Sequence, residues 1–261
     1  MDGRVDPARI ARKAMALCDP DVCCFQEVAA NFATLEGSAG EDQAGRLEQL
    51  FPGYSAHFAA AVDIPDGRGG RRRFGNMILS RIPVRQVFRH SLPWPSDPGV
   101  PNMPRMALEA VVEAPWGPVS VVTTHLEFYS AKQRAAQVEC LIEQQAERAA
   151  HAPAPPARAT GAFEPFARSA ASILTGDFNM RPEDPLVARL LAVWRDAWAL
   201  ANPGAAPPPT FGLHDKRFES EPYRCDYVLV TPDLVPRVAA VRIDVAAQES
   251  DHQPVVVEFS R

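Results

Sequence analysis

The sequence lacks two features that would each assign the protein to a class. No run approaches the roughly 18 consecutive apolar residues of a membrane-spanning helix, so no membrane span is predicted. Basic residues are not in excess either, because the 261 residues carry a net charge of −5. This balance argues against a processive or non-specific DNA nuclease, which needs a broadly basic surface. Small phosphate esters, lipid head groups and a locally basic groove stay open.

Cysteine is scarce and shows no metal-binding or redox spacing. The five cysteines are odd in number, form no Cys-x-x-Cys pair, and include two neighbours, Cys23 and Cys24, in an apolar segment. Such a position indicates packing and not bridging. Because no secretory signal opens the given sequence, we expect reduced thiols and a cytoplasmic protein.

Strands and helices alternate along the whole chain, which predicts a single mixed α/β domain over residues 1–261. Helical spacing and capping residues predict helices after Asp6, over 31–51, from Ser130 to about Arg148, and after Asp184. Apolar runs predict strands at 22–25, 54–62, 74–81, 84–90, 105–113, 119–124, 223–230, 237–245 and 253–259, with one more leading into Asp177. This order fits two packed sheets flanked by helices.

The most informative stretch is SILTGDFNMRP, residues 172–182. Its apolar start predicts a buried strand, after which Gly176 lets the backbone turn. Asp177 and Asn179 are two apart, so in an extended segment their side chains point the same way while Phe178 points into the core. A carboxylate beside a carboxamide suits a hard cation or a phosphate. By itself the pattern fits an ordinary turn equally well.

Further polar residues follow other predicted strands, and each has a structural explanation of its own. His125 is explained as a strand-end histidine, Asp226 as a buried acid paired with Arg224, and Ser250–His252 as a turn. Their number favours a shared site, which comprises Glu27, His125, Asp177, Asn179, Asp226, Asp251 and His252. Carboxylates such as Glu27 suit Mg²⁺ or Mn²⁺, and histidines beside carboxylates are expected to be protonated.

Several short motifs resemble those of the endonuclease/exonuclease/phosphatase superfamily, the deoxyribonuclease I-like metal-dependent phosphohydrolases. They occur in the family order between residues 20 and 259, and the ordered set is highly specific. The motifs are residues 21–27, Gly75–Asn76 with Leu79–Ser80, residues 124–126 with Arg134 and Gln137, residues 176–179, residues 224–227 and residues 250–252.

The resemblance implies a four-layered α/β/β/α sandwich and a role for each matched residue. Glu27 and Asp251 are implied as the metal side, with Mg²⁺ or Mn²⁺ as cofactor. The resemblance also implies that Asp177 orients or deprotonates the attacking water and that Asn179 holds the phosphate. It implies that His252 acts as the transition-state donor and is oriented by Asp226. His125 is implied to contact phosphate or assist the leaving group, and Asn76 to bind substrate.

The sequence departs from the family pattern at its beginning. The family begins with a core strand that ends in an asparagine, and residues 1–19 contain no such strand. Asn31 lies after Glu27 and does not fill this role. We therefore expect either that this start lies downstream of the true one or that the protein lacks its first core strand, which would leave a gap in the sheet and exposed apolar surface. A truncated or mis-assigned start is favoured.

The expected function is divalent-metal-dependent hydrolysis of a phosphate ester, with a phosphodiesterase favoured. The substrate is open between nucleic acid, phospholipid and another small phosphodiester. One alternative is a lipid or inositol phosphate phosphoesterase of the sphingomyelinase or 5-phosphatase type. An alternative of another class is a non-catalytic phosphate-ester-binding protein that has lost turnover with its first strand.

Overall fold

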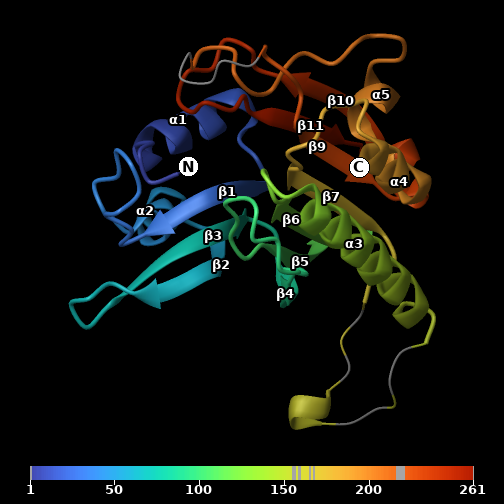
Figure 1. The fold of residues 1–261 in the computed structure, drawn as a ribbon. Coiled ribbons are helices and arrows are strands. Elements are labelled where there is room, and N and C mark those ends of the chain that lie inside the picture. Colours follow the sequence, from blue (N-terminus) through green and yellow to red (C-terminus); the bar gives the residue numbers. More distant parts are fainter. Residues whose placement is uncertain are drawn as a thin grey trace.

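The computed structural model of the protein describes residues 2–154, 157, 160–164, 166, 168–215 and 221–260 (Figure 1). Strands and helices alternate, which confirms the mixed α/β class. The strands are β1 (Val22–Ala30), β2 (Ser55–Pro65), β3 (Arg71–Ser80), β4 (Val84–Ser91), β5 (Met106–Ala114), β6 (Gly117–His125), β7 (Ser172–Asp177), β8 (Arg195–Asp196), β9 (Asp226–Val230), β10 (Val238–Ile243) and β11 (Val255–Phe259). The helices are α1 (Pro7–Cys18), α2 (Gln43–Leu50), α3 (Ala131–His151), α4 (Pro185–Val193) and α5 (Ala197–Ala201), with short 3-10 helices at Gly161–Phe163 and Pro232–Arg237. None of the described helices is both long and apolar enough to cross a membrane.

The described strands form three sheets, and the largest carries His125, Asp177 and Asp226 of the residues predicted to form the site. It has the order β4-β5-β6-β7-β9-β8, while the two smaller sheets have the orders β1-β3-β2 and β10-β11. In the largest sheet β6 and β7 are parallel, and the other neighbours are antiparallel. Two parallel neighbours need a long crossover, which α3 provides between β6 and β7.

Helices begin where the sequence places capping residues. The side chains of Asp6, Ser130 and Asp184 accept hydrogen bonds from backbone N–H groups in the first turns of α1, α3 and α4. Each cap satisfies a donor that the helix itself leaves without a partner.

The helix predicted over 31–51 is wrong for its first part. α2 contains only Gln43–Leu50 and is capped by Asp42. Gly37 and Gly40 have φ angles of 73° and 72°, in the left-handed region that interrupts a right-handed helix. The glycines therefore place turns before α2.

Apolar side chains form three clusters between the layers of elements. The first, around Leu141 and Leu190, packs α3 and α4 on the six-stranded sheet. The second, around Ile78 and Leu108, lies between that sheet and the β1-β3-β2 sheet. The third, around Leu47, packs α1 and α2 on the other face of β1 and β3. The two larger sheets therefore face each other, and each is covered on its outer face by helices.

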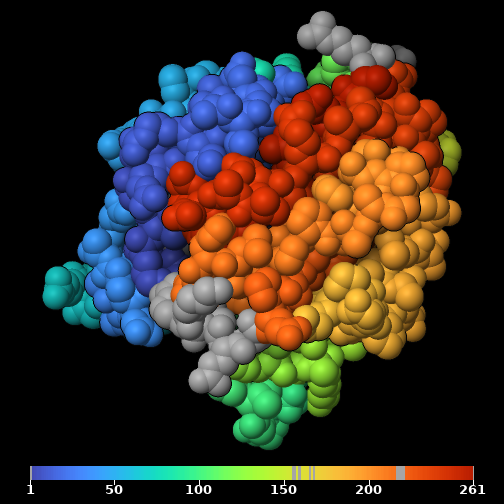
Figure 2. All heavy atoms as spheres, turned by 90° about the horizontal axis from the view of Figure 1, so that it is seen from above, coloured from blue at the N-terminus to red at the C-terminus, as the bar shows by residue number. Residues whose placement is uncertain are grey.

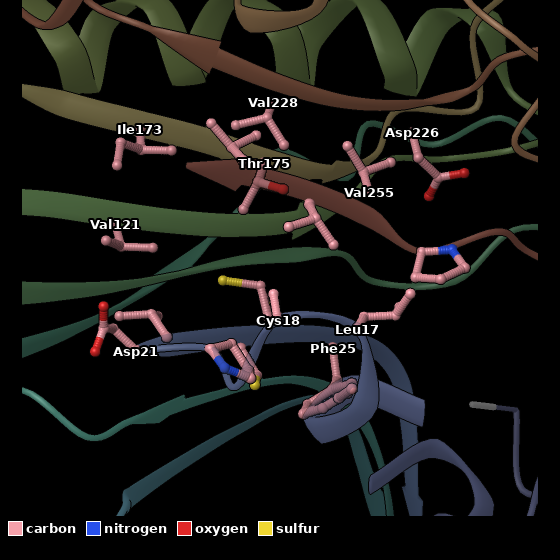
Figure 3. A pocket seen from close by; sticks show the side chains of 18 of the residues that line it. Leu17, Cys18, Asp21, Phe25, Val121, Ile173, Thr175, Asp226, Val228 and Val255 are labelled. Atoms are coloured by element: carbon pink, nitrogen blue, oxygen red, sulfur yellow. The ribbon is translucent and has the colours of Figure 1, made fainter. Parts of the chain in front are cut away.

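An apolar cavity of about 810 Å³ lies between β1 and β11. Its walls include Leu17 of α1, Val121 of β6, Val228 of β9 and Val255 of β11 (Figure 3). In the described residues β1 pairs only with β3, and β11 pairs only with β10, so each has one unpaired edge. Figure 2 shows that segments from the two ends of the sequence, coloured blue and red, lie side by side on the surface.

A buried ion pair joins α3 to the six-stranded sheet. Glu109 of β5 and Arg148 of α3 are fully buried, and Arg148 Nη1 donates to Glu109 Oε2 at 2.9 Å. Ser120 Oγ donates to the same carboxylate at 2.8 Å, and His90 Nε2 lies 2.9 Å from it. Because both charges are buried, removal of one leaves the other without compensation.

Replacing Arg148 by methionine is expected to destabilise the protein by about 3–5 kcal/mol, because the Glu109 carboxylate then stays buried without its cation. The matched control is Arg189→Met, which breaks the exposed Arg189–Glu139 pair of 2.6 Å and is expected to cost less than about 1 kcal/mol. Urea unfolding followed by circular dichroism measures both. Equal losses of stability would contradict the assignment.

Candidate active site

The register of three neighbouring strands assembles the candidate site. His125 is the last residue of β6, Asp177 is the last of β7, and Asp226 is the first of β9. The parallel pairing of β6 with β7 sets His125 opposite Asp177, and the antiparallel pairing of β7 with β9 sets Asp177 opposite Asp226. Side chains that are far apart in the sequence therefore lie in one row at one edge of the sheet.

Gly176 brings β7 close to β6 and does not form the predicted turn. It lies inside β7 with φ 142°, and a Cβ atom at this position would lie 1.9 Å from the carbonyl oxygen of Thr124. Only glycine fits such an approach of two backbones. The chain turns after Asp177 instead, where Asp177 Oδ1 accepts a hydrogen bond of 2.8 Å from Asn179 N.

Asn179 is not extended, which corrects the geometry expected from its spacing to Asp177. Its φ angle is 53°, and its Nδ2 donates to Leu126 O at 2.8 Å. Phe178 is buried in the core as predicted and stacks on Tyr227, with ring centroids 5.2 Å apart. Asn179 therefore reaches the site through a left-handed turn that its own side chain stabilises.

A bulge in β1 places Glu27 at the site. The pairing of β1 with β3 shifts register between Phe25 and Val28, and Glu27 has a φ angle of 59°. Bulges of this kind redirect a side chain, and left-handed non-glycine residues are found preferentially at functional sites. The strand continues to Ala30, so Glu27 lies within β1 and not beyond its end.

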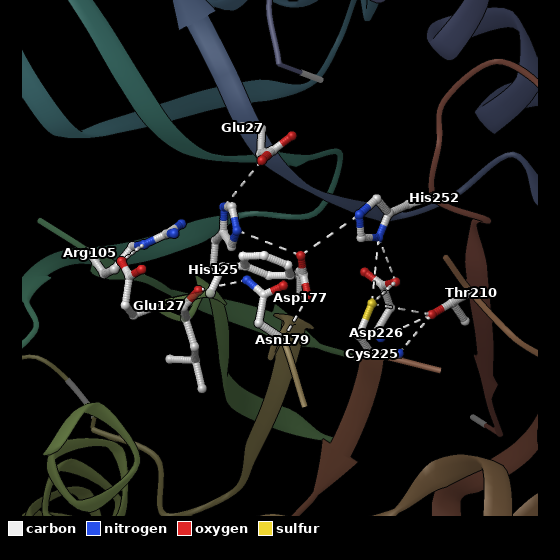
Figure 4. Close-up of polar contacts among 12 residues, drawn as sticks. Glu27, Arg105, His125, Glu127, Asp177, Asn179, Thr210, Cys225, Asp226 and His252 are labelled. Atoms are coloured by element: carbon white, nitrogen blue, oxygen red, sulfur yellow. Dashed lines mark hydrogen bonds and ion pairs between the residues drawn. The ribbon is translucent and has the colours of Figure 1, made fainter. Parts of the chain in front are cut away.

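Carboxylates and imidazoles alternate in a continuous row across the site (Figure 4). His125 Nδ1 lies 3.9 Å from Glu27 Oε1, and His125 Nε2 lies 3.6 Å from Asp177 Oδ2. On the other side, Asp177 Oδ2 lies 3.8 Å from His252 Nε2, and His252 Nδ1 lies 2.8 Å from Asp226 Oδ2. Only the last distance is that of a hydrogen bond. Asp177 is therefore flanked by two imidazoles and bonded to neither.

His252 is held in its charged form by neighbouring carboxylates. Burial by itself lowers the pKa of His252, but the charges of Asp226 and Asp177 and the hydrogen bond to Asp226 together raise it to about 10. Thr210 Oγ1 accepts hydrogen bonds of 3.1 Å from the backbone N–H groups of Cys225 and Asp226 and so fixes the start of β9. At neutral pH His252 is therefore protonated, as the sequence predicted.

Burial has a different consequence at the other two groups of the row. Burial raises the pKa of Asp177 to about 7, against the opposing effect of the charge on His252. Burial, together with the charges of Arg105 and His252, lowers the pKa of His125 well below its usual value. The prediction that both histidines are protonated is therefore wrong for His125. A neutral His125, a carboxyl that titrates near neutrality and a charged His252 form an acid–base set.

The oxygen donors of the site fit a hard divalent cation. The side chain of Glu27 is 28% exposed and that of Asp251 is 10% exposed, and Asp251 precedes His252 in the chain. Arg4 Nη2 lies 3.8 Å from Asp251 Oδ2. Carboxylate and amide oxygens, including Oδ1 of Asn179, are the ligand type that Mg²⁺ and Mn²⁺ prefer.

A second group of ligand-type atoms includes a thiol. One atom each of Asp177, Cys225 and His252 lie within 4.8 Å of one another. A set of one oxygen, one sulfur and one imidazole nitrogen differs from the oxygen ligands that Mg²⁺ and Mn²⁺ prefer.

Asn76 is buried between the two facing sheets. Its Nδ2 donates to Met106 O at 3.0 Å, which joins β3 to the start of β5. This bond gives Asn76 a structural role, and its contact with substrate stays a prediction.

Sequence reasoning missed the buried pair of Arg105 and Glu127. Arg105 Nε donates to Glu127 Oε2 at 3.1 Å, and Figure 4 shows the pair on the His125 side of the row. A signal for Glu127 was present, because a carboxylate close to the end of a buried strand needs a partner or a site. Arg105 stands directly before buried β5, where an unpaired charge is equally costly.

Comparison with known proteins identifies the family. The model of the endonuclease/exonuclease/phosphatase family matches residues 3–252. The chain belongs to this family. The solved endonuclease/exonuclease/phosphatase from Beutenbergia cavernae DSM 12333 is 29% identical with a TM-score of 0.64, over 97% of this chain and 66% of that one. No curated protein gives a significant match.

Two more distant structures of this family's fold have known activities. Mannosyl-6-phosphatase Bt3783 from Bacteroides thetaiotaomicron VPI-5482 is 19% identical with a TM-score of 0.68, over 98% of this chain and 90% of that one. The 3′ phosphatase NExo from Neisseria, bound to a product DNA hairpin, is 20% identical with a TM-score of 0.61, over 97% of this chain and 94% of that one. At these identities the likeness concerns the fold.

Replacing Asp226 by asparagine is expected to lower the pKa of His252 by roughly 1–3 units, because an adjacent negative charge and its hydrogen bond are lost. NMR titration of the His252 ring measures the shift. The control Glu139→Gln removes an exposed acid of α3 and leaves the titration unchanged. An unaltered pKa in the Asp226→Asn protein would show that this carboxylate does not hold the charge of His252.

Proposed function

We propose that the protein is a divalent-metal-dependent phosphoesterase that works by in-line attack of water, with a phosphodiester as the favoured substrate. The observation that carries this proposal is the buried row in which Asp177 lies between neutral His125 and protonated His252. A carboxylate whose pKa is raised toward neutrality accepts a proton efficiently at that pH. Membership in the family supports the same class of reaction.

Each residue of the row has one role in this proposal. Asp177 orients the attacking water and takes its proton. His252 donates its Nε2–H to a phosphate oxygen as charge develops, and Asp226 keeps His252 charged and oriented. Asn179 positions the phosphate, and His125 contacts a phosphate oxygen or assists the leaving group.

Glu27 and Asp251 are the proposed residues that hold Mg²⁺ or Mn²⁺, because their oxygens suit such an ion. When bound, the ion neutralises negative charge on the phosphate. The side chain of Glu27 is 28% exposed, so an ion can approach it from solvent.

Several substrates within this class are candidates. The distant neighbours that share the fold act on a mannose phosphate and on the 3′ end of DNA, so sugar phosphates and nucleic-acid ends are both candidates. A lipid or inositol phosphate ester is the alternative. Plasmid nicking, a phospholipid assay and a sugar phosphate assay run in parallel separate these.

Hydrolysis of bis-p-nitrophenyl phosphate is expected to need added Mg²⁺ or Mn²⁺ and to stop when EDTA removes the ion. Asp177→Ala and His252→Ala are each expected to lower kcat at least about a hundredfold, because each removes a proton-transfer group. Release of p-nitrophenol, followed by absorbance, measures the rate. The exposed-acid variant Glu139→Ala serves as the control and keeps the wild-type rate.

Unchanged rates in both alanine variants would refute the proposed roles. Binding of the diester without metal-dependent turnover would favour the non-catalytic phosphate-ester-binding protein instead. The observation that favours this second function is the cavity between β1 and β11, because Glu27 and Asp226 of the candidate site line that cavity.

We further propose that a strand belongs between β1 and β11, which makes the β1-β3-β2 and β10-β11 sheets two parts of one sheet in a four-layered α/β/β/α sandwich. The unpaired edges of β1 and β11 and the apolar cavity between them support this. A strand in this place would be covered on one face by α1 and on the other by β6, β7 and β9. A strand that is buried on both faces has a nearly continuous apolar sequence.

Joining an apolar segment of about 5–6 residues that ends in asparagine ahead of the chain, through a flexible linker, is expected to raise Tm by more than about 4 °C. The gain comes from filling the cavity and pairing both edges. The matched control carries a proline at the centre of the segment, which removes a ladder hydrogen bond. Differential scanning calorimetry compares the two, and equal Tm values would count against a strand in this position.

A further inference from the structure

Arg105 lies beside the row with hydrogen-bonding capacity that the protein does not use. The residue is only 6% exposed, and its Nε donates to Glu127 Oε2 at 3.1 Å. Its Nη1 atom is buried and has no hydrogen-bond partner among the described residues. Figure 4 shows the guanidinium directed toward the ring of His125. A buried donor of this kind is costly unless a ligand supplies the acceptor.

The surroundings of Arg105 hold its guanidinium in a fixed position. Glu127 Oε1 accepts a hydrogen bond of 3.0 Å from Tyr129 N, while Glu127 N donates to Gln137 Oε1 at 2.9 Å. Arg134 Nη1 donates to the carbonyl oxygen of Glu127 at 2.7 Å. The carboxylate that holds Arg105 is therefore held by the backbone of Tyr129, and α3 holds the backbone of Glu127. A donor fixed in advance stabilises a charged ligand without further ordering.

The charge balance of the site indicates which ligand this donor would bind. The acidic residues of the site outnumber its cations, and they are Glu27, Asp177, Asp226 and Asp251. A phosphate diester carries one negative charge, whereas a phosphate monoester carries nearly two near neutral pH. A fixed, permanent cation is therefore worth more to a monoester than to a diester. Arg105 supplies such a cation at the His125 end of the row.

We infer that Arg105 positions the substrate by donating to a non-bridging oxygen of the scissile phosphate, and that it thereby extends the substrate class to dianionic phosphate monoesters. This inference rests on the proposed phosphoesterase function. Arg105 acts on the substrate by binding and orienting it, and it takes no part in proton transfer. Lysine does not replace it, because an ammonium group cannot keep the bond to Glu127 and also present a second, forked donor.

The test compares p-nitrophenyl phosphate with bis-p-nitrophenyl phosphate in wild-type and Arg105→Lys proteins. The variant is expected to lose on the order of ten- to a hundredfold in kcat/KM for the monoester, the range of one charged hydrogen bond. The loss for the diester is expected to stay within about threefold, since that substrate carries half the charge. The inhibition constant of inorganic phosphate is expected to rise about tenfold or more.

Two further variants separate substrate binding from folding. Arg105→Met combined with Glu127→Gln removes both buried charges, so it avoids leaving a carboxylate without its cation. It is expected to keep a Tm near that of the wild type and to show the same selective loss. Arg148→Met, in which a buried arginine far along α3 is lost, is expected to lower Tm and to affect the two substrates equally.

The outcomes distinguish failure of this inference from failure of the proposed function. Equal losses on both substrates in the Arg105 variants, with an unchanged inhibition constant for phosphate, would overturn the inference and leave the phosphoesterase intact. If the wild-type protein hydrolyses neither substrate, the proposed function fails. Calorimetric titration with inorganic phosphate then still tests Arg105, and weaker binding by the variants supports its role while equal binding refutes it.

Discussion

The backbone register of β6, β7 and β9 is the constraint on which the rest of the site depends. It sets His125, Asp177 and Asp226 opposite one another, and it does so only because Gly176 allows the backbones of β6 and β7 to approach. A shift of one residue would turn these side chains to the other face of the sheet. Catalytic geometry in this fold is thus a property of strand pairing before it is a property of side chains.

Burial converts this geometry into chemistry. His125 and Asp177 are buried and His252 is partly exposed, and each group responds differently because its neighbours differ. Two carboxylates raise the pKa of His252 and keep it protonated. Burial raises the pKa of Asp177 to about 7, and burial together with nearby cations lowers the pKa of His125, which is therefore neutral. Groups whose environments separate their protonation states in this way can divide the work of acid and base.

Much of the fold and most of the candidate site could be predicted from the sequence. Capping residues gave the starts of α1, α3 and α4, and alternation of elements gave the fold class. The site residues were found because polar side chains at the ends of buried strands are rare unless they have a use. Family membership, predicted from ordered motifs, is confirmed by the match over residues 3–252.

Geometry that depends on contacts between distant segments could not be predicted from the sequence. The bulge at Glu27 carries no local signal, because glutamate is not a residue that favours the left-handed region. The turn at Asn179 had a local signal, since asparagine two residues after aspartate also occurs in ordinary turns. The neutral state of His125 follows from Arg105 and His252, which are brought near it only by folding. The sequence predicted a turn at Gly176. The glycine is needed for the close approach to the carbonyl oxygen of Thr124, which lies on another strand and so leaves no local signal.

The cavity between β1 and β11 also bears on how the protein behaves in concentrated solution. Among the described strands, β1 and β11 each have one unpaired edge on which another polypeptide can add a strand. Burial of the apolar lining of the cavity would stabilise such an added strand. Every molecule of the chain described offers the same pair of edges, so edge-to-edge self-association is favoured when no strand occupies the cavity. Self-association and the candidate site are therefore linked through one cavity, since Glu27 and Asp226 are among its lining residues.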